Sequence, residues 1–289
     1  MKLAHSLLWL AACVCVGAYS ALAEQPREPA VFSGPQAGER LRSFEAVLVY
    51  GERAGKTVDV IQLSQNRPTM LIVVNGSNRP AARLSRILMN FAEMRGAKLF
   101  AAVVYLDGDQ SAATEQLQRA VSWWKVAGPV GVSVDGADGP GGYGFNRNVN
   151  VTVLVASEGR VTANFALKQP SETDAPKILK QVVSLVGGRV PGAAETTWLS
   201  FPTAKPAGAK YRSASADVEF RSLMCDLLAA RDADSAARAA RSIEAYAAKQ
   251  DRRRDALKNA ANMMLEGRAR PVTRQHPARR HLARWKQAK

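Results

Sequence analysis

The sequence predicts an α/β fold, a mixed sheet flanked by helices, followed by a small α-helical domain. Two observations predict it. Continuous aliphatic segments alternate with amphipathic helices between residues 58 and 135, which is typical of βαβ units and a parallel sheet. Two further apolar segments, 150–156 and 161–167, then flank the short turn Ser157-Glu-Gly159, which predicts a closing antiparallel hairpin.

The predicted elements follow one another along the first two thirds of the chain. Continuous aliphatic runs such as Met70–Val74 are typical of strands covered on both faces, and apolar residues at a spacing of three and four predict helices. We expect a strand at 58–63, a buried strand at 69–74, a helix from Pro80 that ends at Gly96, a buried strand at 99–106, a helix at 112–125, a short strand at 130–134, the hairpin, and a helix at 174–186 ended by Gly187.

This order of elements resembles the thioredoxin-like superfamily in its redoxin branch, which includes alkyl hydroperoxide reductase, thiol-specific antioxidant and thiol:disulfide interchange proteins. The resemblance covers residues 38–188, about half the chain. The features that carry it are a Gly38-x5-Phe44 segment, a turn at Gly55-Lys-Thr-Val58, a strand–loop–helix at 69–95 and a closing segment at 151–161. It implies a mixed sheet with the nucleophile at the N-terminus of the helix that follows the central strand.

The window where the resemblance would place that nucleophile contains no cysteine. Helix N–H groups at such a position lower a thiol pKa and expose the thiolate, whereas a serine there needs a base, and residues 38–188 contain no histidine. The proline that shapes the substrate groove in this superfamily is also missing from 146–152. We therefore expect no thiol catalysis, metal or cofactor at this window, which comprises Asn75, Gly76, Ser77, Asn78, Arg79, Pro80 and Ala81.

The N-terminus has the pattern of an export signal. Lys2, the apolar run 7–19 and the A-x-A form of Ala21-Leu-Ala23 predict a signal peptide over residues 1–23, too short for a membrane span. Residues 24–37 then form a polar, proline-rich tether. We expect a periplasmic or secreted protein whose mature chain has no transmembrane span. A lipobox-like Leu10-Ala-Ala-Cys13 leaves a lipoprotein anchored through Cys13 as the alternative.

Cleavage after Ala23 would leave Cys225 as the single cysteine, because Cys13 and Cys15 lie in the signal. One cysteine cannot form an internal disulfide, so a free thiol or an intermolecular bond remains open. Apolar neighbours favour burial of Cys225, and the adjacent Asp226 has the wrong sign to activate a thiolate.

The last third of the chain is predicted to be helical and basic. Residues 189–215 are rich in Pro, Ala, Ser and Thr and predict a linker, 216–267 predict a helical domain, and 268–289 form a basic tail. From Ser200 onward the chain has 20 Lys or Arg against 9 Asp or Glu. The tail could bind an anionic surface through Arg274, Arg279, Arg280, Arg284, Trp285, Lys286 and Lys289, and no nucleic-acid-binding motif is present.

We expect an exported, redox-inactive, thioredoxin-like protein that acts as a binding or scaffolding module of the cell envelope, with a protein partner there. Two alternatives stay open. One is a thiol-disulfide oxidoreductase or peroxidase-type antioxidant that uses Cys225 or a partner's thiol. The other is an anchor to anionic envelope surfaces through the basic tail.

Overall fold

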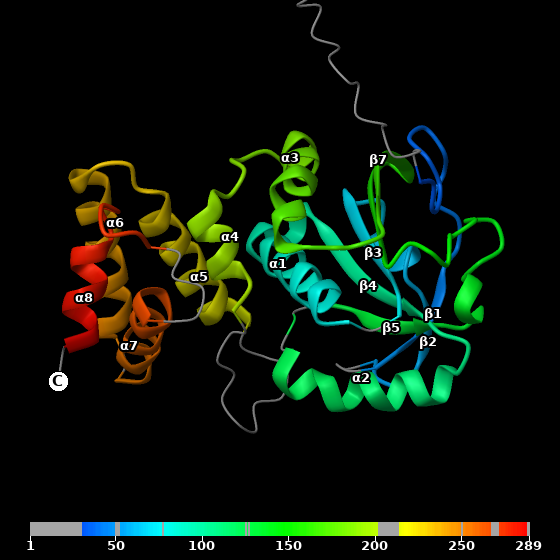
Figure 1. Cartoon of the computed structure of the whole chain (residues 1–289), viewed down its shortest axis with the longest axis horizontal. Helices are drawn as coiled ribbons and strands as arrows, with labels where there is room; N and C mark the ends of the chain where they lie inside the picture. Colours follow the sequence, from blue (N-terminus) through cyan, green and yellow to red (C-terminus); the bar gives the residue numbers. More distant parts are fainter. Residues whose placement is uncertain are drawn as a thin grey trace, which may run out of the picture. The chain divides into compact units, whose positions relative to one another are not determined.

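A computed structural model gives the fold of the chain (Figure 1). The structure describes residues 31–49, 53–76, 78–124, 126, 128–201, 214–249, 251–266 and 272–287. The expected signal peptide and the first half of the expected tether, residues 24–30, lie outside the described residues. Residues from Phe32 onward belong to one compact unit.

A seven-stranded mixed sheet forms the centre of this unit, in the order β2-β1-β5-β4-β3-β6-β7. The central strand β3 lies parallel to β4 and antiparallel to β6, and β4 continues parallel to β5. Antiparallel pairs close both edges, β1 with β2 and β6 with β7. The strands are β1 Glu45–Leu48, β2 Thr57–Asp59, β3 Thr69–Asn75, β4 Phe100–Leu106, β5 Val130–Ser133, β6 Val151–Ser157 and β7 Arg160–Leu167.

Three helices cover one face of the sheet. They are α1 Arg79–Arg95, α2 Gln110–Trp124 and α3 Ala175–Val186. Ile72 of β3 and Val103 of β4 point to this face and belong to the same buried cluster as apolar residues of all three helices. Because β3 is apolar from Met70 to Val74 and β4 is apolar throughout, they also supply side chains to the opposite face.

The opposite face is covered mainly by irregular chain. Leu71 and Val73 of β3 pack there with Phe44 and Tyr143, in a second buried cluster. The Tyr143 hydroxyl donates to the carbonyl oxygen of Arg42 at 2.7 Å, which fixes the loop before β6 to the chain before β1. Sequence periodicity predicts none of this cover, because it lies in loops.

Five further helices follow the sheet, and Figure 1 shows α4 beside α1. They are α4 Ala193–Leu199, α5 Ala214–Ala229, α6 Ala233–Ala248, α7 Asp251–Glu266 and α8 Arg279–Gln287. Helix α4 corrects part of the expected linker 189–215, because its residues Trp198 and Leu199 are buried. Trp198 and Leu199 are adjacent in the sequence, and two neighbouring apolar residues show no helical spacing from which this seven-residue helix could have been predicted.

The predicted fold class is confirmed, with differences at particular elements. The alternation of strands and helices and the closing hairpin all occur. The four-residue strand β1 was not predicted, and the expected strand at 58–63 is split into β2 and a 3₁₀ turn at Gln62–Ser64. The expected basic tail 268–289 contains α8, which packs against α7.

Candidate functional site

The junction between β3 and α1 is a locally satisfied helix start. Gly76 has φ +76°, a left-handed conformation that suits glycine. Asn78 is the N-cap of α1, and its side-chain oxygen accepts the N–H of Ala81 at 2.8 Å. Asn75 donates its side-chain N–H to the carbonyl oxygen of Arg147 at 3.0 Å. The polar groups here therefore build the turn and its cap.

The residues of the predicted window have different exposures. Arg79 and Pro80 are exposed at the first turn of α1, Ala81 is buried, and Ser77 lies outside the described residues. Exposed N–H groups at a helix N-terminus favour negative charge. Such a position would stabilise a thiolate, yet the sequence has no cysteine between residues 16 and 224.

The basic residues near this junction are held by carboxylates. Arg83 pairs with Glu172 at 2.6 Å, and Arg147 forms two 2.6 Å hydrogen bonds with Asp138. The hydrogen bonds from Arg147 lower the pKa of the Asp138 carboxyl. The described residues contain no cis peptide bond, including those that lead into β6.

Cys225 lies inside the helical part of the fold. It is 4% exposed and is the free cysteine of the described chain. Burial raises the pKa of its thiol to about 12, and the charge of Glu195 acts in the same direction against the opposing charges of Arg221 and Arg189. The thiol is therefore protonated at neutral pH and has no direct access to solvent, which is the opposite of a reactive cysteine.

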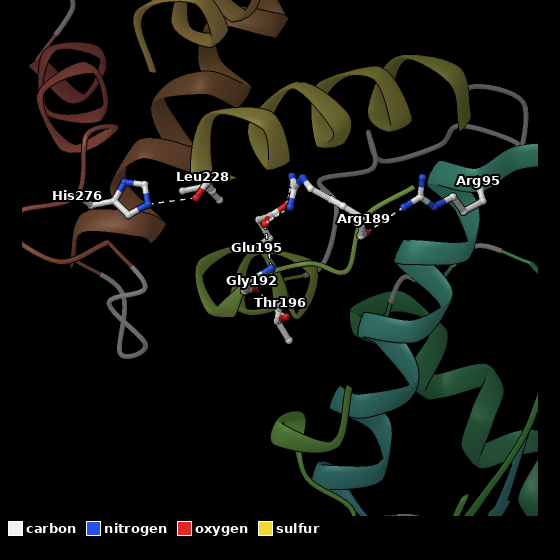
Figure 2. Close-up of polar contacts among 7 residues, drawn as sticks. All are labelled: Arg95, Arg189, Gly192, Glu195, Thr196, Leu228 and His276. Carbon is white, nitrogen blue, oxygen red and sulfur yellow. Dashed lines mark hydrogen bonds and ion pairs between the residues drawn. The ribbon is translucent and has the colours of Figure 1, made fainter. Parts of the chain in front are cut away.

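A polar junction beside Cys225 ties α4 to α1 (Figure 2). Arg189 forms a bidentate ion pair with Glu195 of α4, with distances of 2.6 and 2.5 Å. The N–H of Gly192 also donates to Glu195 at 2.9 Å, so this buried carboxylate is satisfied on both oxygens. Arg95, near the end of α1, donates to the carbonyl oxygen of Arg189 at 3.4 Å.

The middle of α1 makes further buried polar contacts that the sequence pattern did not reveal. Arg86 donates to the carbonyl oxygens of Trp124 and Ser200, both at 2.9 Å. Asn90 donates to the carbonyl oxygen of Leu199 at 2.7 Å. The available signal was weak: Arg86 and Asn90 are two polar residues at a spacing of four, beside the apolar stripe of the helix.

The residues of the expected basic tail have different roles in the structure. Trp285 is buried and its indole N–H donates to Glu244 at 2.8 Å. Glu244 also pairs with Arg284, and Lys286 pairs with Glu266. Arg274, Arg280 and Arg284 are exposed, Arg279 is partly buried, and Lys289 lies outside the described residues.

No metal centre and no membrane-spanning helix emerge from the described part of the chain. Its His, Cys, Asp and Glu side chains form no group of three or more that could hold a metal ion. None of its helices has the length and hydrophobicity needed to cross a bilayer. The organised polar groups are therefore the α1 cap, the junction around Glu195 and the basic helices.

Comparison with known proteins finds similarity in solved structures alone. No protein-family model and no curated protein matches the chain. Peroxidoxin BcpB from Mycobacterium tuberculosis is 13% identical, with 52% of this chain and 97% of that chain covered and a TM-score of 0.40. A DsbF homologue from Corynebacterium diphtheriae is 16% identical, with 55% and 97% covered and a TM-score of 0.41.

Another similar structure is a thiol peroxidase from Chromobacterium violaceum, which is 15% identical, with 54% of this chain and 91% of that chain covered and a TM-score of 0.36. The structural neighbours are thus peroxiredoxins and thioredoxin-like proteins at low identity. What the chain shares with them is limited to a thioredoxin-like fold, and nothing about activity follows from the comparison.

Proposed function

We propose that this protein is an exported thioredoxin-like protein without a thiol active site, which binds or scaffolds a protein partner in the cell envelope. The observation that carries the proposal is that the position suited to a reactive thiol and the position of the one described cysteine are different. The exposed start of α1 is the position that would activate a thiol, and Asn78 and Arg79 occupy it. The one described cysteine is instead buried, with a raised pKa.

The thiol-based alternative fits these contacts poorly. A nucleophilic cysteine needs thiolate character and access, and Cys225 has neither. Residues 38–188 also contain no histidine that could act as a base for Ser77 or another hydroxyl. We therefore assign the proposed binding role to the protein surface.

Assays of thiol chemistry on the purified full-length protein test the proposal. The wild type is expected to give only background rates in insulin reduction and in peroxide consumption with dithiothreitol. The Cys225→Ser variant should give the same rates. Turnover by the wild type that disappears in Cys225→Ser would overturn the proposal and establish thiol chemistry.

An installed cysteine provides the positive control. In an Arg79→Cys, Cys225→Ser double variant, a thiol stands at the exposed first turn of α1, where the helix terminus favours the thiolate. At neutral pH, iodoacetamide should alkylate this installed thiol at least 100-fold faster than it alkylates Cys225 in the folded wild type. The factor follows from the much larger thiolate fraction of an exposed thiol, because the thiolate is the reacting form. Equal rates would show that Cys225 is accessible, contrary to the proposal.

Export is a separate part of the proposal and rests on the N-terminal sequence. We expect the secreted product to begin at Glu24, after Ala23. N-terminal sequencing of the mature protein tests this directly. A product that begins at a lipid-modified Cys13 would replace secretion with membrane anchoring.

A further inference from the structure

Four exposed arginines lie on the adjacent flanks of two C-terminal helices. Arg238 and Arg241 belong to α6, and Arg280 and Arg284 belong to α8. Each pair has the three- or four-residue spacing that puts side chains on one flank of a helix. We call these four residues the α6–α8 basic face.

The contacts between the helices bring the two flanks together. Glu244 of α6 accepts the indole N–H of Trp285 at 2.8 Å and pairs with Arg284. Before α8, His276 forms a 3.1 Å hydrogen bond with the carbonyl oxygen of Leu228, close to the start of α6 (Figure 2). Helix α8 therefore lies close to α6 around Glu244, while its main contact in the fold is with α7.

The register of this contact places the arginines on either side of one carboxylate. Arg241 lies three residues before Glu244, and Arg280 lies four residues before Arg284. Glu244 is thus the acidic residue at the seam, and Asp232 and Asp234 lie near Arg238 at the start of α6. The four arginines outnumber these three acids, in a chain whose net charge is +15.

The face offers charge but no apolar or aromatic group. The large hydrophobic side chains that the described residues expose are Phe32 and Val134, neither of which lies on α6 or α8. Trp285 is buried and its N–H is already bonded to Glu244. Insertion into acyl chains and stacking on unpaired bases both need exposed apolar or aromatic groups, so neither mode suits this face.

We propose that the α6–α8 basic face docks on the phosphate layer of an anionic phospholipid bilayer. Two adjacent helices present guanidinium groups over an extended area, which suits a layer of headgroups better than a single small anion. The attraction is electrostatic and acts without insertion, because each Arg close to an anionic membrane adds to the binding free energy. The inference adds a surface to the proposed envelope function and does not depend on thiol chemistry.

Vesicle co-sedimentation with the full chain tests the surface. The wild type should bind vesicles of phosphatidylglycerol and phosphatidylcholine and should not bind vesicles of phosphatidylcholine alone. Binding should weaken steeply between about 50 and 500 mM salt, because the screening length falls from about 14 Å to about 4 Å in that range. Wild type that fails to bind the anionic vesicles, or binds them with no dependence on salt, would overturn the proposal.

A matched pair of variants locates the binding. The triple variant R238Q/R241Q/R280Q removes three charges from the face and leaves the Arg284–Glu244 pair intact. It should lower the vesicle partition coefficient at least tenfold, since each Lys or Arg near such a surface contributes about 1 kcal/mol. The control R53Q/K56Q/K168Q removes the same charge from exposed positions around the sheet, and should change the partition coefficient less than twofold.

Three outcomes would count against this assignment. Equal loss in the two triple variants would mean that net charge alone drives binding, and an unaffected face variant would place the binding elsewhere. Tighter binding to duplex DNA than to the anionic vesicles at equal phosphate concentration would replace the bilayer with nucleic acid as the partner. Far-UV circular dichroism confirms that each variant is folded. The redox assays give an independent result, so the two proposals fail separately.

Discussion

The two ends of helix α1 use their polar side chains in different ways. At the N-terminal end, Asn78 caps the helix, Arg79 is exposed, and Arg83 forms a half-exposed ion pair with Glu172. From Arg86 onward, the part that we call the buried end, Arg86 and Asn90 are buried and donate to backbone carbonyl oxygens of other elements. Burial of a charged or amide group is costly unless its hydrogen bonds are made, so the buried end depends on its neighbours.

This difference shows which part of the helix depends on tertiary contacts. The start of α1, where the sequence resemblance would place a reactive cysteine, holds an N-cap. The single described cysteine, Cys225, belongs to α5, a helix that packs against α1. The buried end binds the region around α4, so the helices that follow the sheet are part of the structural unit of α1.

The largest predicted effect comes from breaking the buried end at Arg86. Burial lowers the pKa of Arg86 to about 10, so the side chain is still charged at pH 7. Its guanidinium serves carbonyl oxygens of Trp124 and Ser200. Arg86→Ala should therefore lower the free energy of unfolding by about 3 kcal/mol, because two hydrogen bonds and the packing of a buried side chain are lost.

Urea unfolding followed by circular dichroism measures this loss. Arg86→Lys is the matched control, because it retains the charge but cannot serve both carbonyl oxygens with the geometry of a guanidinium. We expect it to fall between the wild type and Arg86→Ala. A loss below about 1 kcal/mol for Arg86→Ala would show that the contacts of the buried end contribute little.

The contrast between the two ends explains what the sequence could predict. Periodicity indicated α1, the strands on either side of it and a helix start at Pro80, because these depend on local patterns, whereas the cap at Asn78 came from the structure. The partners of Arg86 and Asn90 lie more than 35 residues away along the chain, as the carbonyl oxygens of Trp124 and Leu199. Such contacts depend on the tertiary fold, and in the sequence they are visible only as isolated polar residues within an apolar helix pattern.

The basic segment gives a similar lesson for the candidate site. Its charge was evident from the sequence, which placed Trp285 among the residues that could bind an anionic surface. The burial of Leu282 and Trp285 in α8, and the bond from Trp285 to Glu244, required the packing of α6 to be known. The arginines of α6 consequently escaped the sequence prediction, because 40 residues separate Glu244 from Arg284.

A second prediction uses the pH dependence of Cys225. Burial raises its pKa from 9.0 to about 12, so the folded state disfavours the thiolate that forms readily on unfolding. The contribution to stability is complete below pH 9 and is lost as the pH rises from 9 toward 12. At pH 10 the wild type should have lost about 1.4 kcal/mol through this group.

The Cys225→Ala variant isolates that contribution, because it has no thiol to titrate. Unfolding free energies at pH 8 and pH 10 should differ more for the wild type than for Cys225→Ala, by about 1 kcal/mol. Identical pH dependence in the two proteins would mean that Cys225 is more accessible than its burial indicates. This would also weaken the contrast between the buried and exposed ends of α1.

The exposed end should respond more weakly to removal of its cap. Asn78→Ala deletes the side-chain oxygen that accepts the Ala81 N–H at 2.8 Å. We expect a loss of about 1 kcal/mol in the free energy of unfolding, since an unfilled N-cap leaves one N–H without its protein acceptor. Asn78→Ser keeps an acceptor and should stay within a few tenths of the wild type. A loss as large as that of Arg86→Ala would remove the difference between the two ends.

The smallest effect is predicted one turn along, at Arg83. Its ion pair with Glu172 is short, at 2.6 Å, but the Arg83 side chain is 51% exposed. Water and salt screen such a pair, and two long side chains lose freedom to form it, so Arg83→Ala should cost less than about 0.5 kcal/mol. A double-mutant cycle with Glu172→Ala measures the coupling energy, which should fall toward zero in high salt. A coupling above about 1.5 kcal/mol would show that the exposed end is held as firmly as the buried end, because only a desolvated pair reaches that strength.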